Sequence, residues 1–137
     1  MKSILNIDPR YAETDQMGII HHSVYPVWYE MGRVKFCDDM GFPFKKIEDL
    51  GVGLAMIHMD INYTKPARFG FPLKMITKLI KCTRVRMTFH YEIFNMDNEL
   101  IHMGESELVW VGSDLKPLNV YKRQPDLYER FIKQVEV

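Results

Sequence analysis

The sequence predicts an α+β fold in which an antiparallel, curved sheet of about five strands wraps around one long central helix. The first observation is a single long helical pattern of apolar residues near the start of the chain. The second is a later series of consecutive strand patterns joined by short links, which indicates antiparallel pairing. Because no other segment is long and apolar enough, that helix has to cover the sheet.

The first expected element is a strand over residues 3–11, which Pro9 ends or places at a sheet edge. A loop is expected over residues 13–20, because Asp15 and Gly18 are residue types that favour turns. The chain therefore reaches its long helix through a polar turn that contains an isolated carboxylate.

The long helix is predicted over residues 23–40, with Ser23 as its N-cap and Pro26 in its first turn. Gly41 is a natural end for this helix, and a short second helix follows over residues 43–50. The apolar positions that recur at helical steps are Val24, Val27, Trp28, Met31 and Val34, widened by Tyr25, Tyr29 and Phe36.

The remainder of the chain alternates with a period of two, which is typical of strands. We expect the strands to follow one another as a meander, with a hairpin turn at residues 97–99 and a short terminal helix over residues 125–134. The expected strand ranges are 55–63, 72–83, 86–95 and 100–111. A curled antiparallel sheet around one buried helix is the hotdog arrangement.

Length and composition favour one domain over residues 1–137, and 47% apolar residues exclude an intrinsically disordered chain. Eighteen basic residues balance eighteen acidic ones, which argues against a general nucleic-acid-binding role. No apolar run is long enough to span a membrane. Cys37 and Cys82 do not resemble a disulfide framework or a zinc site, so a reducing cytoplasm is the expected location.

Asp15 is the main candidate for a catalytic group, since it lies shortly before the helix N-terminus. Free backbone N–H groups and the helix dipole favour negative charge there. A base or nucleophile beside such a site is the minimum equipment for hydrolysing an acyl compound. The sequence leaves open whether Asp15 attacks a thioester carbonyl directly or activates water, and the structural alternative is a turn former or helix cap.

His22 is the candidate for oxyanion stabilisation, through its backbone N–H at the start of the helix. A metal site is not expected, because the side chains of His21 and His22 are adjacent and point in different directions. No HxH or HExxH spacing occurs elsewhere in the chain. Around these groups we expect Gly18, Ile20 and Tyr25 to contribute to substrate binding.

Charged residues outside this segment have structural interpretations as well. Glu30 and Arg33 are three residues apart on the helix and are expected to form an ion pair, with Glu30 as an alternative general base. A group of basic residues at strand ends and links is expected to lie in solvated turns, or to gather around a phosphate-rich ligand. These residues are Lys65, Arg68, Lys81, Arg84 and Arg86.

The segment 11–33 resembles the signature of the 4-hydroxybenzoyl-CoA-type thioesterases of the hotdog superfamily. It is most similar to the bacterial acyl-CoA thioesterases associated with the Tol–Pal system. A second landmark of that family is a tyrosine followed by Pro-Ala-Arg, which matches Tyr63 and residues 66–68. The matching positions in the first segment are Asp15, Gly18, His22, Tyr25, Glu30 and Arg33.

The resemblance implies hydrolysis of acyl-CoA, or of an acyl group on acyl carrier protein, with Asp15 as the catalytic carboxylate. It implies that the backbone N–H of His22 polarises the carbonyl, and that neither a metal nor an organic cofactor takes part. It also implies a homodimer with a continuous sheet and sites at the interface, which can associate further into a homotetramer.

Two alternatives use the same fold. A non-catalytic hotdog module would bind acyl-CoA or acyl carrier protein without cleaving it, because a groove and its chemistry are separable. A hydratase or dehydratase would need an acid–base pair placed for proton transfer at carbon, and Asp15 has no clear partner beyond the neighbouring histidines.

Overall fold

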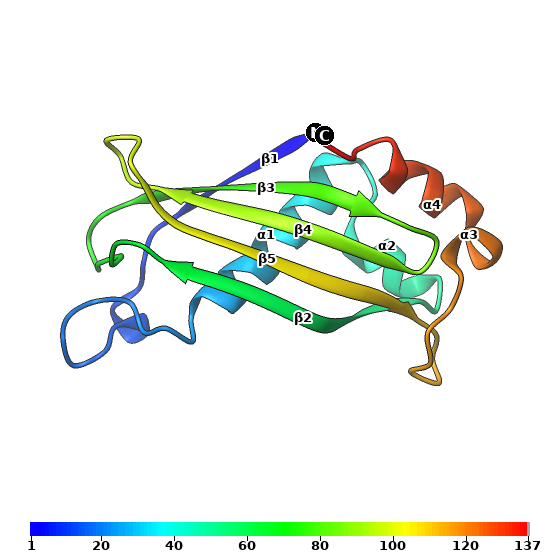
Figure 1. Ribbon diagram of the computed structural model, residues 1–137, viewed down its shortest axis with the longest axis horizontal. Coiled ribbons are helices and arrows are strands. Elements are labelled where there is room, and N and C mark those ends of the chain that lie inside the picture. Colours follow the sequence, from blue (N-terminus) through cyan, green and yellow to red (C-terminus); the bar gives the residue numbers. More distant parts are fainter. Residues whose placement is uncertain (137) are drawn as a thin grey trace.

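The computed structural model describes residues 1–136 and contains a five-stranded antiparallel sheet with helix α1 across one face (Figure 1). The sheet order is β1-β3-β4-β5-β2. In chain order the elements are β1 (Lys2–Ile7), the 3-10 helix η1 (Tyr11–Glu13), α1 (Tyr25–Asp39), α2 (Phe44–Asp49), β2 (Gly53–Tyr63), β3 (Leu73–Cys82), β4 (Arg86–Phe94), β5 (Leu100–Val111), α3 (Val120–Arg123) and α4 (Pro125–Ile132).

The predicted four-strand meander is wrong for β2, which pairs with β5 and is not a neighbour of β3. Only β3, β4 and β5 follow one another as a meander. The segment between β2 and β3 covers residues 64–72 and is longer than an ordinary hairpin loop. It passes from the β2 edge of the sheet to β3, which lies next to β1 at the opposite edge. Alternation in the sequence identifies a strand, but it carries no information about which strand lies beside it.

Helix α1 is confirmed, although its 15 residues are fewer than the predicted range 23–40. The predicted N-cap is wrong, because Val24 occupies that position and Ser23 lies before it. The Ser23 hydroxyl is hydrogen-bonded to Nδ1 of His21 at 2.7 Å. Gly41 has a φ of 84°, a left-handed conformation that suits glycine, and the chain leaves the helix there.

The predicted apolar stripe of α1 is confirmed for its aromatic residues and wrong for three of its aliphatic ones. Val27, Met31 and Val34 are 53%, 44% and 39% exposed in the single chain. The helix packs through these aromatic residues and through Gly32, where a Cβ atom would lie 2.5 Å from Met75 Cε. The glycine therefore permits a close approach of α1 to β3. The buried residues of α1 are Tyr25, Trp28, Tyr29, Gly32, Phe36 and Cys37.

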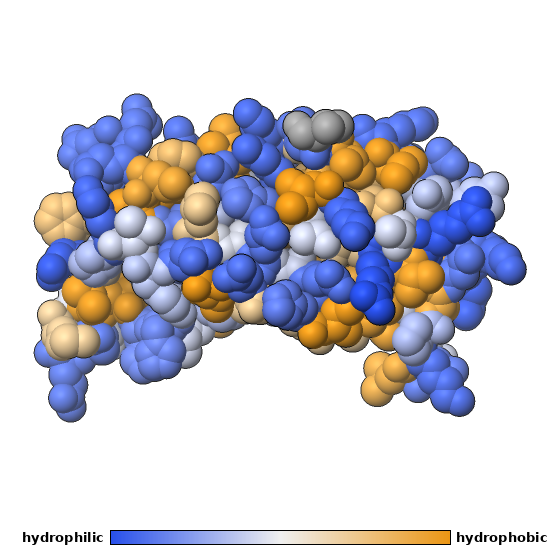
Figure 2. Space-filling view, viewed as in Figure 1, coloured by the Kyte–Doolittle hydropathy of each residue, from blue (hydrophilic) through white to orange (hydrophobic). Residues whose placement is uncertain are grey.

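The two faces of the sheet have different chemistry. Alternate residues of β3 and β4 are buried beneath α1. Between them, the outer-facing residues form ion pairs across strands, such as Lys78 with Glu92 at 3.2 Å and Arg86 with Glu107 at 3.1 Å. Figure 2 shows hydrophilic side chains across the middle of the molecule in this view. The alternation thus orients the sheet with its apolar side against the helix.

Two smaller differences from the predicted elements lie near the ends of the chain. β1 ends at Ile7, since Pro9 cannot donate a backbone hydrogen bond to a neighbouring strand, and η1 follows it. The short helix α3 was not predicted. In contrast, β5 has the predicted bounds, and Asn98 turns the 97–99 hairpin with a φ of 60°. No helix among the described residues has the length and apolar character needed to cross a membrane.

Candidate active site

The loop before α1 closes around Asp15. Its backbone N–H donates to the carbonyl of Ile19 at 2.8 Å, and the N–H of Gly18 donates back to the carbonyl of Asp15 at 3.2 Å. Gly18 has a φ of 78°, which the turn requires. Asp15 Oδ1 accepts hydrogen bonds from the backbone N–H groups of Met17 and Ile19, at 2.8 and 3.3 Å. Within residues 1–136, Oδ2 of Asp15 has no hydrogen-bond partner, so one carboxylate oxygen remains free.

Glu13 anchors the start of this loop to the helix. Its side chain is only 8% exposed, and Oε1 accepts a hydrogen bond from the backbone N–H of Arg10 at 2.7 Å. Oε2 accepts a hydrogen bond from Trp28 Nε1 at 3.1 Å, and the Glu13 carbonyl accepts one from the His21 N–H at 2.8 Å. Sequence reasoning placed Glu13 in an ordinary loop and missed this role.

The far side of the loop pairs with the segment that follows β2. The backbone N–H of Ile20 donates to the carbonyl of Ala67 at 2.8 Å, and Ile19 forms an isolated antiparallel bridge with Arg68. The N–H of Lys65 donates in turn to the carbonyl of Ile101 at 2.9 Å, which ties this segment to β5. Two segments that are distant in the sequence are thereby fixed side by side.

His22 lies between the loop and the first turn of α1. Its carbonyl accepts a hydrogen bond from the Tyr63 hydroxyl at 2.8 Å, so the end of β2 is joined to the start of the helix. The backbone N–H of His22 makes no hydrogen bond within the described residues, whereas the N–H groups of Ser23 and Val24 are both bonded to His21. A free donor therefore remains beside the helix N-terminus, where the dipole is positive.

A cavity of about 370 Å³ lies at the meeting point of these segments. Four of the predicted site residues line it, namely Asp15, Ile20, His22 and Tyr25, whereas Gly18 only shapes the turn beside it. Its complete lining is Asp15, Met17, Ile19, Ile20, His22, Tyr25, Tyr63, Thr64, Lys65 and Pro66. The cavity thus combines a carboxylate, a free backbone donor and an apolar wall.

Behind the cavity wall lies His102 of β5, which sequence reasoning also missed. Its ring stacks on Tyr25 with centroids 4.2 Å apart, and Tyr63 packs edge-on against it at 5.3 Å. Nε2 is hydrogen-bonded to the Tyr29 hydroxyl, while Nδ1 is buried and has no hydrogen-bond partner in the described part of the chain. Burial lowers the pKa of His102 to about 4, so the imidazole is neutral at pH 7. The sequence signal for this region is Gly104, a glycine in the middle of a strand, which indicates that another group packs closely against the backbone; here that group is the side chain of Tyr29.

The predicted ion pair between Glu30 and Arg33 is not formed. Arg33 instead donates a hydrogen bond of 2.9 Å to the hydroxyl of Tyr91, which reaches the helix from β4. Glu30 and Arg33 line a separate cavity of about 290 Å³ between α1, α2 and the sheet. Glu30 is therefore not in the cavity of Asp15 within one chain. The structure places no group of three or more metal-binding side chains together among residues 1–136.

The sequence was also compared with protein families and with known proteins. The sequence model of the family described as "Thioesterase-like superfamily" matches residues 9–131. The Bacillus subtilis protein named "Putative acyl-CoA thioesterase YneP" is 34% identical over 128 residues, which cover 93% of each chain. The "Acyl-CoA thioester hydrolase YbgC" of Escherichia coli O157:H7 is 26% identical over 101 residues, covering 74% of this chain and 75% of that protein.

A solved structure shares the whole fold. The DHNA-CoA thioesterase from Staphylococcus aureus superposes with a TM-score of 0.92 and 34% identity, over 96% of this chain and 89% of that one. The predicted hotdog fold and the predicted family of thioesterases are thereby confirmed, whereas a place in the Tol–Pal-associated branch is not shown.

Proposed function

Because the chain belongs to the thioesterase-like superfamily, we propose that it hydrolyses the thioester of acyl-CoA to a free acid and CoA. The single observation that carries the proposal is the shared cavity of Asp15 and His22. One carboxylate oxygen and one backbone N–H, neither with a hydrogen-bond partner among residues 1–136, belong to residues that line the same space. Thioester hydrolysis needs these two groups, a nucleophile or base and a donor for the oxyanion.

The proposed chemistry begins with attack on the thioester carbonyl carbon. Either Oδ2 of Asp15 attacks and forms an anhydride that water then hydrolyses, or Asp15 takes a proton from an attacking water molecule. In both routes negative charge develops on the carbonyl oxygen, and the backbone N–H of His22 donates a hydrogen bond to it. The carbon–sulfur bond then breaks, and the CoA sulfur leaves as a thiolate that takes up a proton.

We further propose that Ile20 and Tyr25 hold the acyl group, while the left-handed conformation of Gly18 sets the direction of the carboxylate. Both wall residues are buried, with 3% and 2% exposure. Burial raises the pKa of Tyr25, so its hydroxyl stays neutral and can only act as a hydrogen-bonding group at pH 7. The same site would accept an acyl group carried on acyl carrier protein, since the reacting atoms are identical.

A homodimer is part of the proposal. β2 is an edge strand of 11 residues with exposed apolar side chains at Met56 and Ile57, which is an arrangement that favours strand pairing with a second copy. Antiparallel pairing about the middle of β2 would set the Tyr63 end of one strand beside the Leu54 end of the other. The cavity of Asp15 would then adjoin the partner's cavity between α1, α2 and the sheet, which Leu54 lines.

We propose further association into a homotetramer through the exposed face of α1, which carries Val27, Met31 and Val34. A single folded domain and a cytoplasmic location are also proposed, the latter because Cys37 and Cys82 are free thiols. Sedimentation equilibrium of the purified protein tests the assembly. A mass of two or four chains is expected, and a monomer at micromolar concentration would contradict it.

The decisive experiment compares two aspartate variants in a thiol-release assay with a panel of acyl-CoA substrates. Asp15→Asn keeps the Oδ1 acceptor of the turn but removes the nucleophile or base, so kcat should fall about a hundredfold or more. The matched control is Asp8→Asn, an exposed carboxylate outside the cavity, which should retain wild-type turnover. Burial raises the pKa of Cys37 to about 12 and that of Cys82 to about 11, so the protein's own thiols should react slowly with the reagent.

Full activity in Asp15→Asn would contradict the assignment of this residue. Tight binding of acyl-CoA with no thiol release by the wild type would favour a non-catalytic binding module. Water addition to an enoyl-CoA would favour a hydratase.

A further inference from the structure

A second cavity continues from the candidate active site along the segment after β2. It has a volume of about 410 Å³, and Lys65 and Pro66 line both this cavity and that of Asp15. The two spaces therefore adjoin at Lys65. The lining of the second cavity is Lys65, Pro66, Ala67, Arg68, Phe71, Leu73, Asn95 and Ile101.

The chemistry of the second cavity is cationic and aromatic. Lys65 and Arg68 supply two positive charges, and Phe71 presents a ring that is 64% exposed. Among residues 1–136, no carboxylate lies within ion-pair distance of Arg68. Guanidinium and ammonium groups beside an exposed ring suit an anionic ligand, and phosphate in particular.

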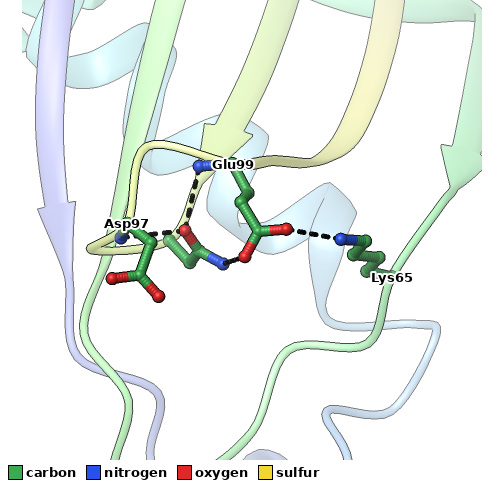
Figure 3. Close-up of polar contacts among 4 residues, drawn as sticks. Lys65, Asp97 and Glu99 are labelled. Atoms are coloured by element: carbon green, nitrogen blue, oxygen red, sulfur yellow. Dashed lines mark hydrogen bonds and ion pairs between the residues drawn. The ribbon is translucent and has the colours of Figure 1, made fainter.

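Lys65 is not free in the structure, because a carboxylate from another element neutralises it. Its Nζ lies 2.5 Å from Oε2 of Glu99, which belongs to the turn between β4 and β5 (Figure 3). The pair is accessible to solvent, with side-chain exposures of 53% and 47%. Exposed ion pairs contribute little to stability because water and salt screen them, so a competing anion can displace this carboxylate.

Glu99 is held in position by its own turn. Asn95 Nδ2 donates to Oε1 of Glu99 at 3.1 Å, and Asn95 Oδ1 accepts from the backbone N–H groups of Asp97 and Glu99, each at 3.0 Å. Contacts to Lys65 and Asn95 lower the pKa of Glu99, so it is ionised at pH 7. The carboxylate of Asp97 points away from Lys65 in Figure 3. The turn therefore directs one carboxylate to Lys65 and the other away from it.

We propose that Lys65 and Arg68 bind a phosphate group of the thioester carrier, and that the carboxylate of Glu99 occupies Lys65 until this phosphate displaces it. The proposal rests on the proposed thioesterase function. It makes Glu99 a specificity-determining residue, because its charge competes with the phosphate for Lys65 and so lowers the preference for phosphorylated carriers over unphosphorylated ones. The ligand chemistry is a phosphate ester, whether from free CoA or from the phosphopantetheine arm of a carrier protein.

The test uses one acyl group on three carriers: CoA, 4′-phosphopantetheine and pantetheine. The readout is the ratio of kcat/KM for each phosphorylated carrier to that for pantetheine. Glu99→Gln removes the competing charge and should raise the ratio for CoA about threefold. Lys65→Met should lower the ratio for CoA about tenfold, and adding Glu99→Gln to Lys65→Met should have no further effect.

The comparison of carriers identifies the source of the phosphate. If 4′-phosphopantetheine shows the same changes as CoA, the arm of a carrier protein suffices as the phosphate source. If only CoA shows these changes, the nucleotide phosphates are the ligand.

Matched controls separate local contact from overall charge. Asp97→Asn changes the net charge equally within the same turn, and Lys46→Met removes an exposed cation on α2. Both should leave the ratio unchanged, and melting temperatures should show that all variants fold. An unchanged ratio in Glu99→Gln, or an equal rise in Asp97→Asn, would overturn the proposal.

Isothermal titration calorimetry tests the phosphate site independently of catalysis. Free CoA and pantetheine are titrated into the wild type and Glu99→Gln, which requires no turnover. Tighter binding of CoA by Glu99→Gln, with pantetheine affinity unchanged, is expected even if the wild type cleaves no thioester. Equal affinity of both proteins for CoA would overturn the subsite whatever the activity assay shows.

Discussion

The indole N–H of Trp28 donates a buried hydrogen bond of 3.1 Å to Oε2 of Glu13, and this contact joins α1 to the loop that carries Asp15. The other oxygen of Glu13, Oε1, accepts a hydrogen bond from the backbone N–H of Arg10. Both carboxylate oxygens are therefore occupied by donors, one on each side of the loop. The position of Asp15 beside the helix N-terminus depends on a carboxylate that is itself absent from the cavity lining.

Glu13→Gln should destabilise this loop. A glutamine amide has one oxygen, so its NH₂ group must face either the Trp28 indole or the Arg10 N–H, and one buried donor loses its acceptor. We expect the free energy of unfolding in urea to fall by about 2 kcal/mol and kcat to fall about tenfold. Glu48→Gln, an exposed change on α2, is the control. Wild-type values for both quantities in Glu13→Gln would refute the anchoring role.

Tyr63→Phe removes the hydrogen bond of 2.8 Å from the Tyr63 hydroxyl to the carbonyl of His22. Because the tyrosine is 51% exposed, stability should change by less than about 1 kcal/mol. The backbone N–H of His22 is the proposed oxyanion donor, so kcat/KM should fall about threefold to tenfold when the hydrogen bond that positions His22 is lost. Tyr11→Phe, at a residue that is 76% exposed, is the control in the same assay. A loss of stability without a loss of turnover would count against this assignment.

Gly104→Ala should be strongly destabilising. A Cβ atom there would overlap the Tyr29 hydroxyl and lie 2.6 Å from Tyr29 Cζ, in a fully buried site. Overpacking of this kind costs about 3 kcal/mol, which thermal or urea unfolding measures directly. Gly53→Ala is the matched control, because its nearest atom, on Val111, is 3.8 Å away. Equal stability of the two variants would show that Tyr29 can move aside.

Stability should fall between pH 7 and pH 5 because of His102. Burial lowers its pKa to about 4, against 6.5 in the unfolded chain, so between these values the unfolded chain binds more protons. The contribution of the neutral imidazole is complete above about pH 6.5 and is lost as the pH falls toward 4. We expect a loss of about 2 kcal/mol by pH 5, which should be absent in His102→Gln. Parallel stability profiles for wild type and variant would contradict this prediction.

Local patterns in the sequence predicted the elements well, because periodicity reflects which side chains are buried. The bounds of β5 and the existence of α1 followed from spacing alone. The partner of β2 did not, since strand pairing depends on a crossing link whose path is set by tertiary contacts such as Ile20 with Ala67. The buried face of α1 was predicted only in part, because Gly32 and the aromatic rings fit the sheet more closely than the valines do.

The candidate site was predictable where its residues are close in sequence. Asp15, Ile20, His22 and Tyr25 come from one loop and the helix that follows it, and they do share a cavity. Glu13 and His102 were missed, because their importance comes from partners far along the chain. A buried tryptophan needs an acceptor for its N–H, so Trp28 was a usable signal for Glu13.

Because Trp28 is hydrogen-bonded to Glu13, its intrinsic fluorescence is a probe of the loop that carries Asp15. The chain has two tryptophans, and they lie in different surroundings: Trp28 is bonded to the loop of Asp15, whereas Trp110 packs against Phe131 of α4. Indole fluorescence is sensitive to the charge and polarity around the ring. Replacing Trp110 by phenylalanine would leave a single tryptophan, at the loop, whose emission should change when a ligand enters the cavity, without any added dye.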